Sequence, residues 1–299
     1  MTIQRVSTYS MHQNTLGDVS RVQNNITNLQ NQISSGKKTD NFQGLGSKVE
    51  HFVSLEDKMA KAENYIENNA VILSRVNTTR VVMEDIIDLV DDMENLIVAS
   101  RNLGVEDSLD FDNQMGNMRD RLGEMLNTRF DGQYLFGGTR TNAPPVADNP
   151  APLVPGVPDA NYYDGSSEDV VARVDDNVEI NYGVRADAEG FQKVFASISL
   201  AIESEGENDE GLGEALDLMQ DGLKEVIAEQ TSVNSNIVAI ESITTRHGDL
   251  QLYWKGVSES LINTDIVEAS TQLAIDQTVL QAAFQSFASL NRLRLVDFL

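Results

Sequence analysis

Few side chains in this sequence could support catalytic or metal chemistry. The chain has no cysteine, which excludes disulfides, thiolate nucleophiles and cysteine-bound metals. The three histidines, His12, His51 and His247, are far apart in the sequence, and none has a second ligand at metal-binding spacing. We therefore expect ordinary polar or core histidines, and neither a metal nor a cofactor.

The glycine-rich and acidic stretches are equally unspecific. Neither Gly44-Leu45-Gly46 nor Gly211-Leu212-Gly213 completes a dinucleotide or phosphate-binding pattern, so both predict turns. Asp107, Asp110 and Asp112 lack the spacing of an EF-hand loop and are more typical of a helix start. We predict no catalytic residue and no enzyme. An enzyme housed in the middle of the chain is the least favoured alternative.

The charge of the chain limits its partners. It has 22 Lys and Arg against 47 Asp and Glu, a net charge of −25 over 299 residues. Such a charge repels nucleic acid and anionic membrane, so we expect neither as a partner. No apolar run approaches the ~20 residues of a membrane span, and residues 1–14 lack the apolar core of a secretory signal.

The prolines divide the chain into two arms and a middle. All six lie between residues 144 and 158. Because proline breaks helix interiors, this distribution predicts helical arms around an insertion. The stretch 148–214 has a net charge of −13 and predicts a solvated surface segment. Within it, 170–174 and 178–184 have strand composition and flank a turn at 175–177, which predicts a β-hairpin.

Both arms carry apolar residues alternately three and four positions apart, the pattern of one helix face. In the first arm this stripe ends before Ser34-Ser35-Gly36, a plausible helix end with a glycine cap. It restarts over 48–103, which as one helix is ~80 Å long at 1.5 Å per residue, and a shorter segment covers 111–129. Asn69 and Arg80 interrupt the long stripe. We also expect a strand at Tyr134-Leu135-Phe136.

The second arm mirrors the first. A helix is expected over 191–202, an apolar stripe over 212–240, and a polar break near Thr244–Gly248. The tail then repeats apolar residues at strict sevens from Ile266 and stays apolar to its last residue. Free chain ends are normally polar, so an apolar end implies that something buries it.

The stripes of 48–130 and 211–250 are interpreted as the core of the chain. Those at the two ends, 16–33 and 262–299, would leave much apolar surface exposed if they only paired with each other, and such a surface marks an interaction site. The predicted assembly interface is Val19, Val22, Ile26, Leu29, Ile33, Ile266, Leu273, Leu280, Phe287 and Leu290.

Six short stretches resemble the flagellin and hook-associated protein family. They are Arg5-Val6-Ser7-Thr8, Gln13-Asn14, the run from Leu29 to Lys38, the segment Asp131–Thr141, the run Gln281–Leu290, and the ending Val296–Leu299. The resemblance covers both arms. In the family a Ser-Gly-Lys signature is usually followed by Asp-Asp-Pro or Asp-Asp-Ala, whereas here Thr39-Asp40-Asn41 follows Lys38.

This resemblance implies a mainly α fold: an elongated antiparallel helical rod with coiled-coil ends and a small inserted β-rich domain. It implies terminal assembly regions at 1–40 and 262–299, a rod of 41–143 and 191–261, and an outer domain at 144–190. It implies a secreted, extracellular structural protein that joins hook to filament. The implied partners are further subunits, hook-associated protein 1, flagellin, and an export chaperone on the C-terminal helix. Filament flagellin and a non-flagellar coiled-coil adhesin are the alternatives.

Overall fold

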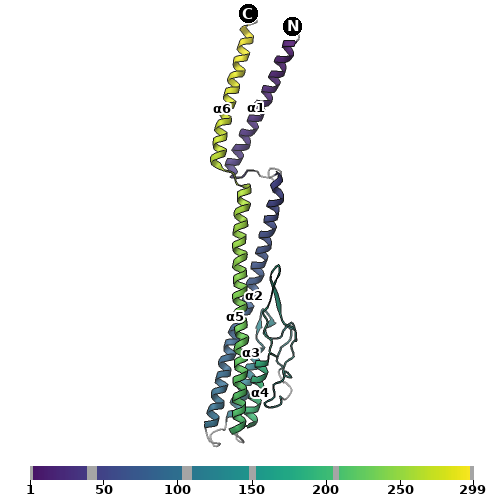
Figure 1. Ribbon diagram of the computed structural model, residues 1–299, viewed down its shortest axis with the longest axis vertical. Helices are drawn as coiled ribbons and strands as arrows, with labels where there is room; N and C mark the ends of the chain where they lie inside the picture. Colours follow the sequence, from purple (N-terminus) through teal and green to yellow (C-terminus); the bar gives the residue numbers. More distant parts are fainter. Residues whose placement is uncertain (1–2, 39–45, 103–109, 148–152, 205–208, 297–299) are drawn as a thin grey trace. The chain divides into compact units, whose positions relative to one another are not determined.

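The computed structural model describes residues 3–38, 46–102, 110–147, 153–204 and 209–296. Within these ranges, side chains are described from residue 13 to residue 288, except at positions 102 and 209. The chain divides into two units, one formed by residues 1–60 and 250–299 and the other by residues 61–249. Within the described residues the fold is mainly helical, as the sequence predicts, with two short β-hairpins (Figure 1). The predicted departure at Thr39-Asp40-Asn41 lies outside the described residues.

In the first unit, α1 (Ile3–Ser35) and α6 (Ile266–Val296) run antiparallel (Figure 1). Gly36, with φ +72°, ends α1 in the left-handed conformation that glycine adopts without a steric cost. The Asp265 side chain starts α6 by accepting hydrogen bonds from the backbone N–H groups of Val267 and Glu268, at 2.9 and 3.1 Å.

The two units are linked in sequence by the long helices α2 (Val49–Asn102) and α5 (Asp209–Ile262). The prediction of one unbroken helix over 48–103 is confirmed. The predicted break near Thr244–Gly248 is wrong, because α5 continues through it to Ile262. The polar side chains there make tertiary contacts instead of ending the helix, as shown below.

In the second unit, α2 and α5 share a core with α3 (Phe111–Leu126) and α4 (Glu189–Ser204). The core stripes predicted for 48–130 and 211–250 supply many of its buried residues. Its largest fully buried side chains include Met83, Ile86, Met93, Ile97, Met115, Leu122, Leu126, Phe136, Tyr162, Phe191, Ile198 and Met219.

Two hairpins form the β structure. The predicted hairpin is present as β3 (Val171–Asp175) and β4 (Val178–Asn181), paired antiparallel. A second hairpin pairs β1 (Arg129–Phe130) with β2 (Gln133–Tyr134). The predicted helical segment therefore ends at Leu126 and not at residue 129, and the strand expected at Tyr134–Phe136 ends at Tyr134.

Gly137 and Gly138 lie where the backbone packs closely against residues 166–168 of the inserted segment. Gly138 has φ +61°, and a Cβ placed there would lie 2.4 Å from the Ser166 carbonyl oxygen and 2.7 Å from that of Glu168. This close approach allows the Ser166 N–H to donate to the Gly137 carbonyl at 3.0 Å. A glycine at position 138 is therefore needed for the backbone at 166–168 to pack against it.

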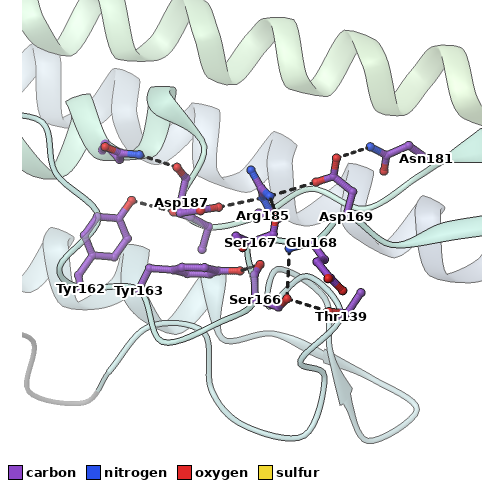
Figure 2. Close-up of polar contacts among 12 residues, drawn as sticks. Thr139, Tyr162, Tyr163, Ser166, Ser167, Glu168, Asp169, Asn181, Arg185 and Asp187 are labelled. Carbon is purple, nitrogen blue, oxygen red and sulfur yellow. Dashed lines mark hydrogen bonds and ion pairs between the residues drawn. The ribbon is translucent and has the colours of Figure 1, made fainter.

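Arg185 lies at the centre of the same region (Figure 2). Its guanidinium pairs with Asp187 at 3.0 Å and with Asp169 at 3.4 Å, and it donates to the Ser167 carbonyl oxygen. Asn181 of β4 donates to Asp169 at 2.7 Å, so the network also joins the β3–β4 hairpin to the loop before it.

Candidate assembly interface

Backbone hydrogen bonds join residues 36–38, which follow α1, to residues 262–264, which precede α6. The Lys38 N–H donates to the Ile262 carbonyl at 2.7 Å, and the Thr264 N–H donates to the Gly36 carbonyl at 2.8 Å. Lys37 and Asn263 form an isolated antiparallel bridge. These bonds hold the end of α1 beside the start of α6, and the two helices then contact each other beyond this end.

The predicted stripe of α1 is the half-buried side of that helix. Val19, Val22, Ile26, Leu29 and Ile33 are all partly buried, whereas the residues directly beside each of the first four are exposed. Because the described surface that covers α1 comes mainly from α6, the spacing of three and four identifies the side that faces α6.

On α6 the predicted residues differ in how far they are buried. Leu273, Leu280 and Phe287 are partly buried, but Ile266 is 53% exposed, and the side chain of Leu290 lies outside the described residues. The most buried positions of this helix are ones outside the predicted set, Ala269 and Asp276, at 5% and 8% exposure. They share the sevenfold spacing of the stripe, which was the sequence signal for them.

A second apolar surface on α6 was not predicted, apart from Ile266, which belongs to the predicted interface. Its members are large apolar side chains between 46% and 77% exposed: Ile266, Val267, Ile275, Val279 and Phe284. From Ile266 to Ala288 the helix carries only two charges, Glu268 and the inward-facing Asp276. The scarcity of charge along α6 was the signal that the stripe analysis missed, because the solvent-facing side of a helix normally carries charged residues.

The charge of the chain is separated between the two units. Residues 1–60 and 250–299 carry ten acidic and nine basic side chains, a net charge of −1. Residues 61–249 therefore carry −24 of the total of −25. The unit with the exposed apolar helix is thus nearly neutral, which suits packing against further copies of itself.

The polar network of the insertion has the features of a structural site. The Tyr162 hydroxyl donates to the Ala186 carbonyl at 2.7 Å, and the Tyr163 hydroxyl to the Ser166 carbonyl at 2.8 Å (Figure 2). Burial raises the pKa of Tyr162 well above its usual range and raises that of Tyr163 to about 12. Both phenols therefore stay protonated at neutral pH and donate to backbone.

The described part of the chain was compared with the requirements of a metal cluster and of a membrane-spanning helix. There, no three histidine, aspartate or glutamate side chains are grouped so that they could hold a metal ion. Nor does any helix of this part have the length and apolar character required to cross a membrane.

Comparison with known proteins agrees with an assembly function. Residues 6–141 match the family described as the bacterial flagellin N-terminal helical region, so the class of protein that the chain resembles is flagellin-like. Within this class, it is similar over 97% of its length to flagellar hook-associated protein 3 of Escherichia coli K12, at 22% identity, and of Salmonella typhimurium LT2, at 20% identity. Each match covers 98% of the relative.

Solved structures share the fold. A candidate flagellar hook-associated protein of Vibrio parahaemolyticus matches 72% of this chain and 97% of its own, with TM-score 0.60 and 15% identity. Bacillus cereus FlgL matches 70% of this chain and 98% of its own, with TM-score 0.56 and 17% identity. The predicted resemblance to the flagellin and hook-associated protein family is confirmed, and the relatives' names favour the hook-associated function over filament flagellin or an adhesin.

Proposed function

We propose that this chain is a structural subunit of the bacterial flagellum that joins the hook to the filament. The observation that carries this proposal is similarity along nearly the whole chain to relatives named flagellar hook-associated protein 3. These relatives are structural proteins, and we propose that the chain likewise has no catalytic function and needs no cofactor. Its place is then outside the cell, as part of the flagellum.

The proposed assembly region is 1–40 with 262–299, attached to a rod of 41–143 and 191–261 and an outer domain of 144–190. The inner faces of α1 and α6 pair within one copy through the predicted stripe. The exposed apolar residues of α6, among them Val267, Ile275 and Phe284, then pack against neighbouring subunits. The near neutrality of this unit supports the proposal, because no net charge opposes close packing of several copies.

The partners that follow from this function are other axial proteins of the flagellum. We propose hook-associated protein 1 on one side, flagellin on the other, and further copies of this chain within the layer. An export chaperone that covers the C-terminal helix would shield its apolar surface before assembly, since exposed stripes of this kind otherwise associate non-specifically.

Leu280→Asp tests the assembly interface. Leu280 is half-buried on the inner stripe, and an unpaired charge buried there costs several kcal/mol. We expect the variant to abolish filament assembly and swimming in a strain whose own copy is deleted, while residues 61–249 stay folded. Val238→Asp is the matched control, because Val238 is 65% exposed on α5 outside the proposed interface. Normal filaments with Leu280→Asp would refute the interface.

Immunogold electron microscopy tests the location independently, with antibody against residues 144–190 on intact cells. A single band of gold at the boundary between hook and filament is the expected result. Gold along the whole filament would indicate a flagellin, and absence of gold from flagella would favour the adhesin.

A further inference from the structure

The turn of the β3–β4 hairpin lies between the two long helices of the unit 61–249. Its adjacent residues Asp175 and Asp176 bind different helices, Asp176 binding α2 and Asp175 binding α5. Both contacts occur close in sequence to the end of this unit, which begins at Lys61 on α2 and ends at Asp249 on α5.

On the α2 side, Asp176 receives two side chains. The Lys61 ammonium lies 2.6 Å from its Oδ1, and the Tyr65 hydroxyl donates to the same oxygen at 3.0 Å. Lys61 and then Tyr65 lower the pKa of Asp176 through these hydrogen bonds. Desolvation raises the pKa of Tyr65, and the bond to Asp176 raises it further. The carboxylate is therefore charged and bonded to α2 at neutral pH.

On the α5 side, Asp175 pairs with the Arg246 guanidinium. The neighbouring His247 is 6% exposed, and its Nε2 lies 3.6 Å from Asp175 Oδ1. The imidazole stacks on the Tyr65 ring, with centroids 5.1 Å apart and planes 12° from parallel. This stack joins α5 directly to α2 beneath the turn.

Asn69 of α2 adds a buried contact with the β3–β4 hairpin and another with α5. It is fully buried on α2, and its Nδ2 lies 3.2 Å both from the Val174 carbonyl oxygen of β3 and from Thr244 Oγ1 of α5. The Asn69 side chain therefore bonds α2 to both the hairpin and α5. At the other end of the hairpin, Asn236 of α5 donates to the Asn181 carbonyl oxygen at 2.8 Å.

We propose that the β3–β4 hairpin is a strap that holds α2 against α5 at this end of the unit 61–249. Asp176 binds α2 and Asp175 binds α5. The Tyr65–His247 stack and the hydrogen bonds of Asn69 join the two helices beside these contacts. The insertion is then a mechanical part of the helical unit and not only its outer surface. The inference goes beyond the proposed function and holds whether or not the chain lies at the hook–filament junction.

Hydrogen exchange of the full-length chain, followed by mass spectrometry, tests the strap. The variant is Asp175→Asn with Asp176→Asn, which keeps the shape of the turn and removes both charges. We expect amide exchange to become about tenfold faster in α2 around residues 61–69 and in α5 around residues 244–249, because local opening depends on such tertiary contacts. The matched control is Glu179→Gln, on the same hairpin, whose only described ion pair is to Arg173 within the hairpin.

Two results would overturn the proposal. In one, exchange accelerates only in β3 and β4 while α2 and α5 stay protected, so the hairpin binds the helices without holding them. In the other, Glu179→Gln accelerates the helices as much as the double variant does. Tyr65→Phe keeps the ring stack and removes only the hydroxyl. It should give a smaller acceleration, and it should add little to Asp176→Ala because both remove the same bond, from the Tyr65 hydroxyl to Asp176 Oδ1.

Discussion

Gly138→Ala is the substitution whose effect the structure specifies best. Alanine in the left-handed conformation costs about 1–2 kcal/mol. The new Cβ would also meet the Ser166 and Glu168 carbonyl oxygens at 2.4 and 2.7 Å, so that backbone must move away. The move would break the hydrogen bonds from the Thr139 N–H to Glu168 and from the Ser166 N–H to Gly137, at 3.2 and 3.0 Å. Each is worth about 1 kcal/mol.

The expected loss is therefore about 3–4 kcal/mol in the free energy of unfolding. Urea unfolding followed by circular dichroism measures it as a lower midpoint at unchanged slope. Gly132→Ala is the matched control, since Gly132 also has positive φ, +76°, but its Cβ would meet nothing within 4 Å. That variant should lose only the conformational cost of about 1–2 kcal/mol. Equal losses at the two glycines would refute the close-approach argument.

Two further predictions concern stability. Gly116→Ala should stabilise the chain by about 0.5–1 kcal/mol, because Gly116 lies inside α3 and a Cβ there meets nothing within 4 Å; an unchanged or lower melting temperature would contradict this. Because the pKa of Asp176 is lowered in the folded state, its stabilisation is present above the ordinary aspartate value of about 3.9 and is lost as the pH falls through the lowered value. The difference in urea midpoint between the wild type and Asp176→Asn should therefore be present at pH 6, start to shrink as the pH falls below about 3.9, and be lost once the pH is below the lowered pKa of Asp176. A difference that does not shrink as the pH falls below about 3.9 would contradict it.

The helical arms were predictable because their signals are local. The spacing of three and four, the glycine at position 36 and the absence of proline each depend on neighbouring residues, and α1, α2 and α6 follow from them. The turn at Asp175–Asn177 was equally local, and the hairpin is present.

The errors arose where a polar residue is explained by a distant segment. Thr244 and His247 suggested a break in α5, and Asn69 interrupted the stripe of α2. In the structure these three residues meet one another or the β3–β4 hairpin. Nothing within a window of α5 shows that Asn69 will contact Thr244 or that Asp175 will contact His247, so the local pattern indicated an end where the helix continues.

The proposed interface was predictable only in part, for the same reason. Regular spacing identified the stripe between α1 and α6, but the exposed positions of α6 follow no single stripe. They are noticeable only once the opposite face is known to be covered. The assignment of these exposed residues to contacts between subunits remains a prediction.

The charge of the chain is distributed as in an ionic surfactant, in which an apolar part is joined to a charged part. A nearly neutral part with exposed apolar residues is joined to a part that carries a net charge of −24. In surfactants, repulsion between charged head groups opposes the association of the apolar parts. Salt weakens that repulsion, because charges separated by more than the Debye length, about 10 Å at 0.1 M ionic strength, are largely screened from each other. By the same physics, we expect the ionic strength of the medium to help set the concentration at which copies of this chain associate in the proposed assembly, alongside the fit between their helices.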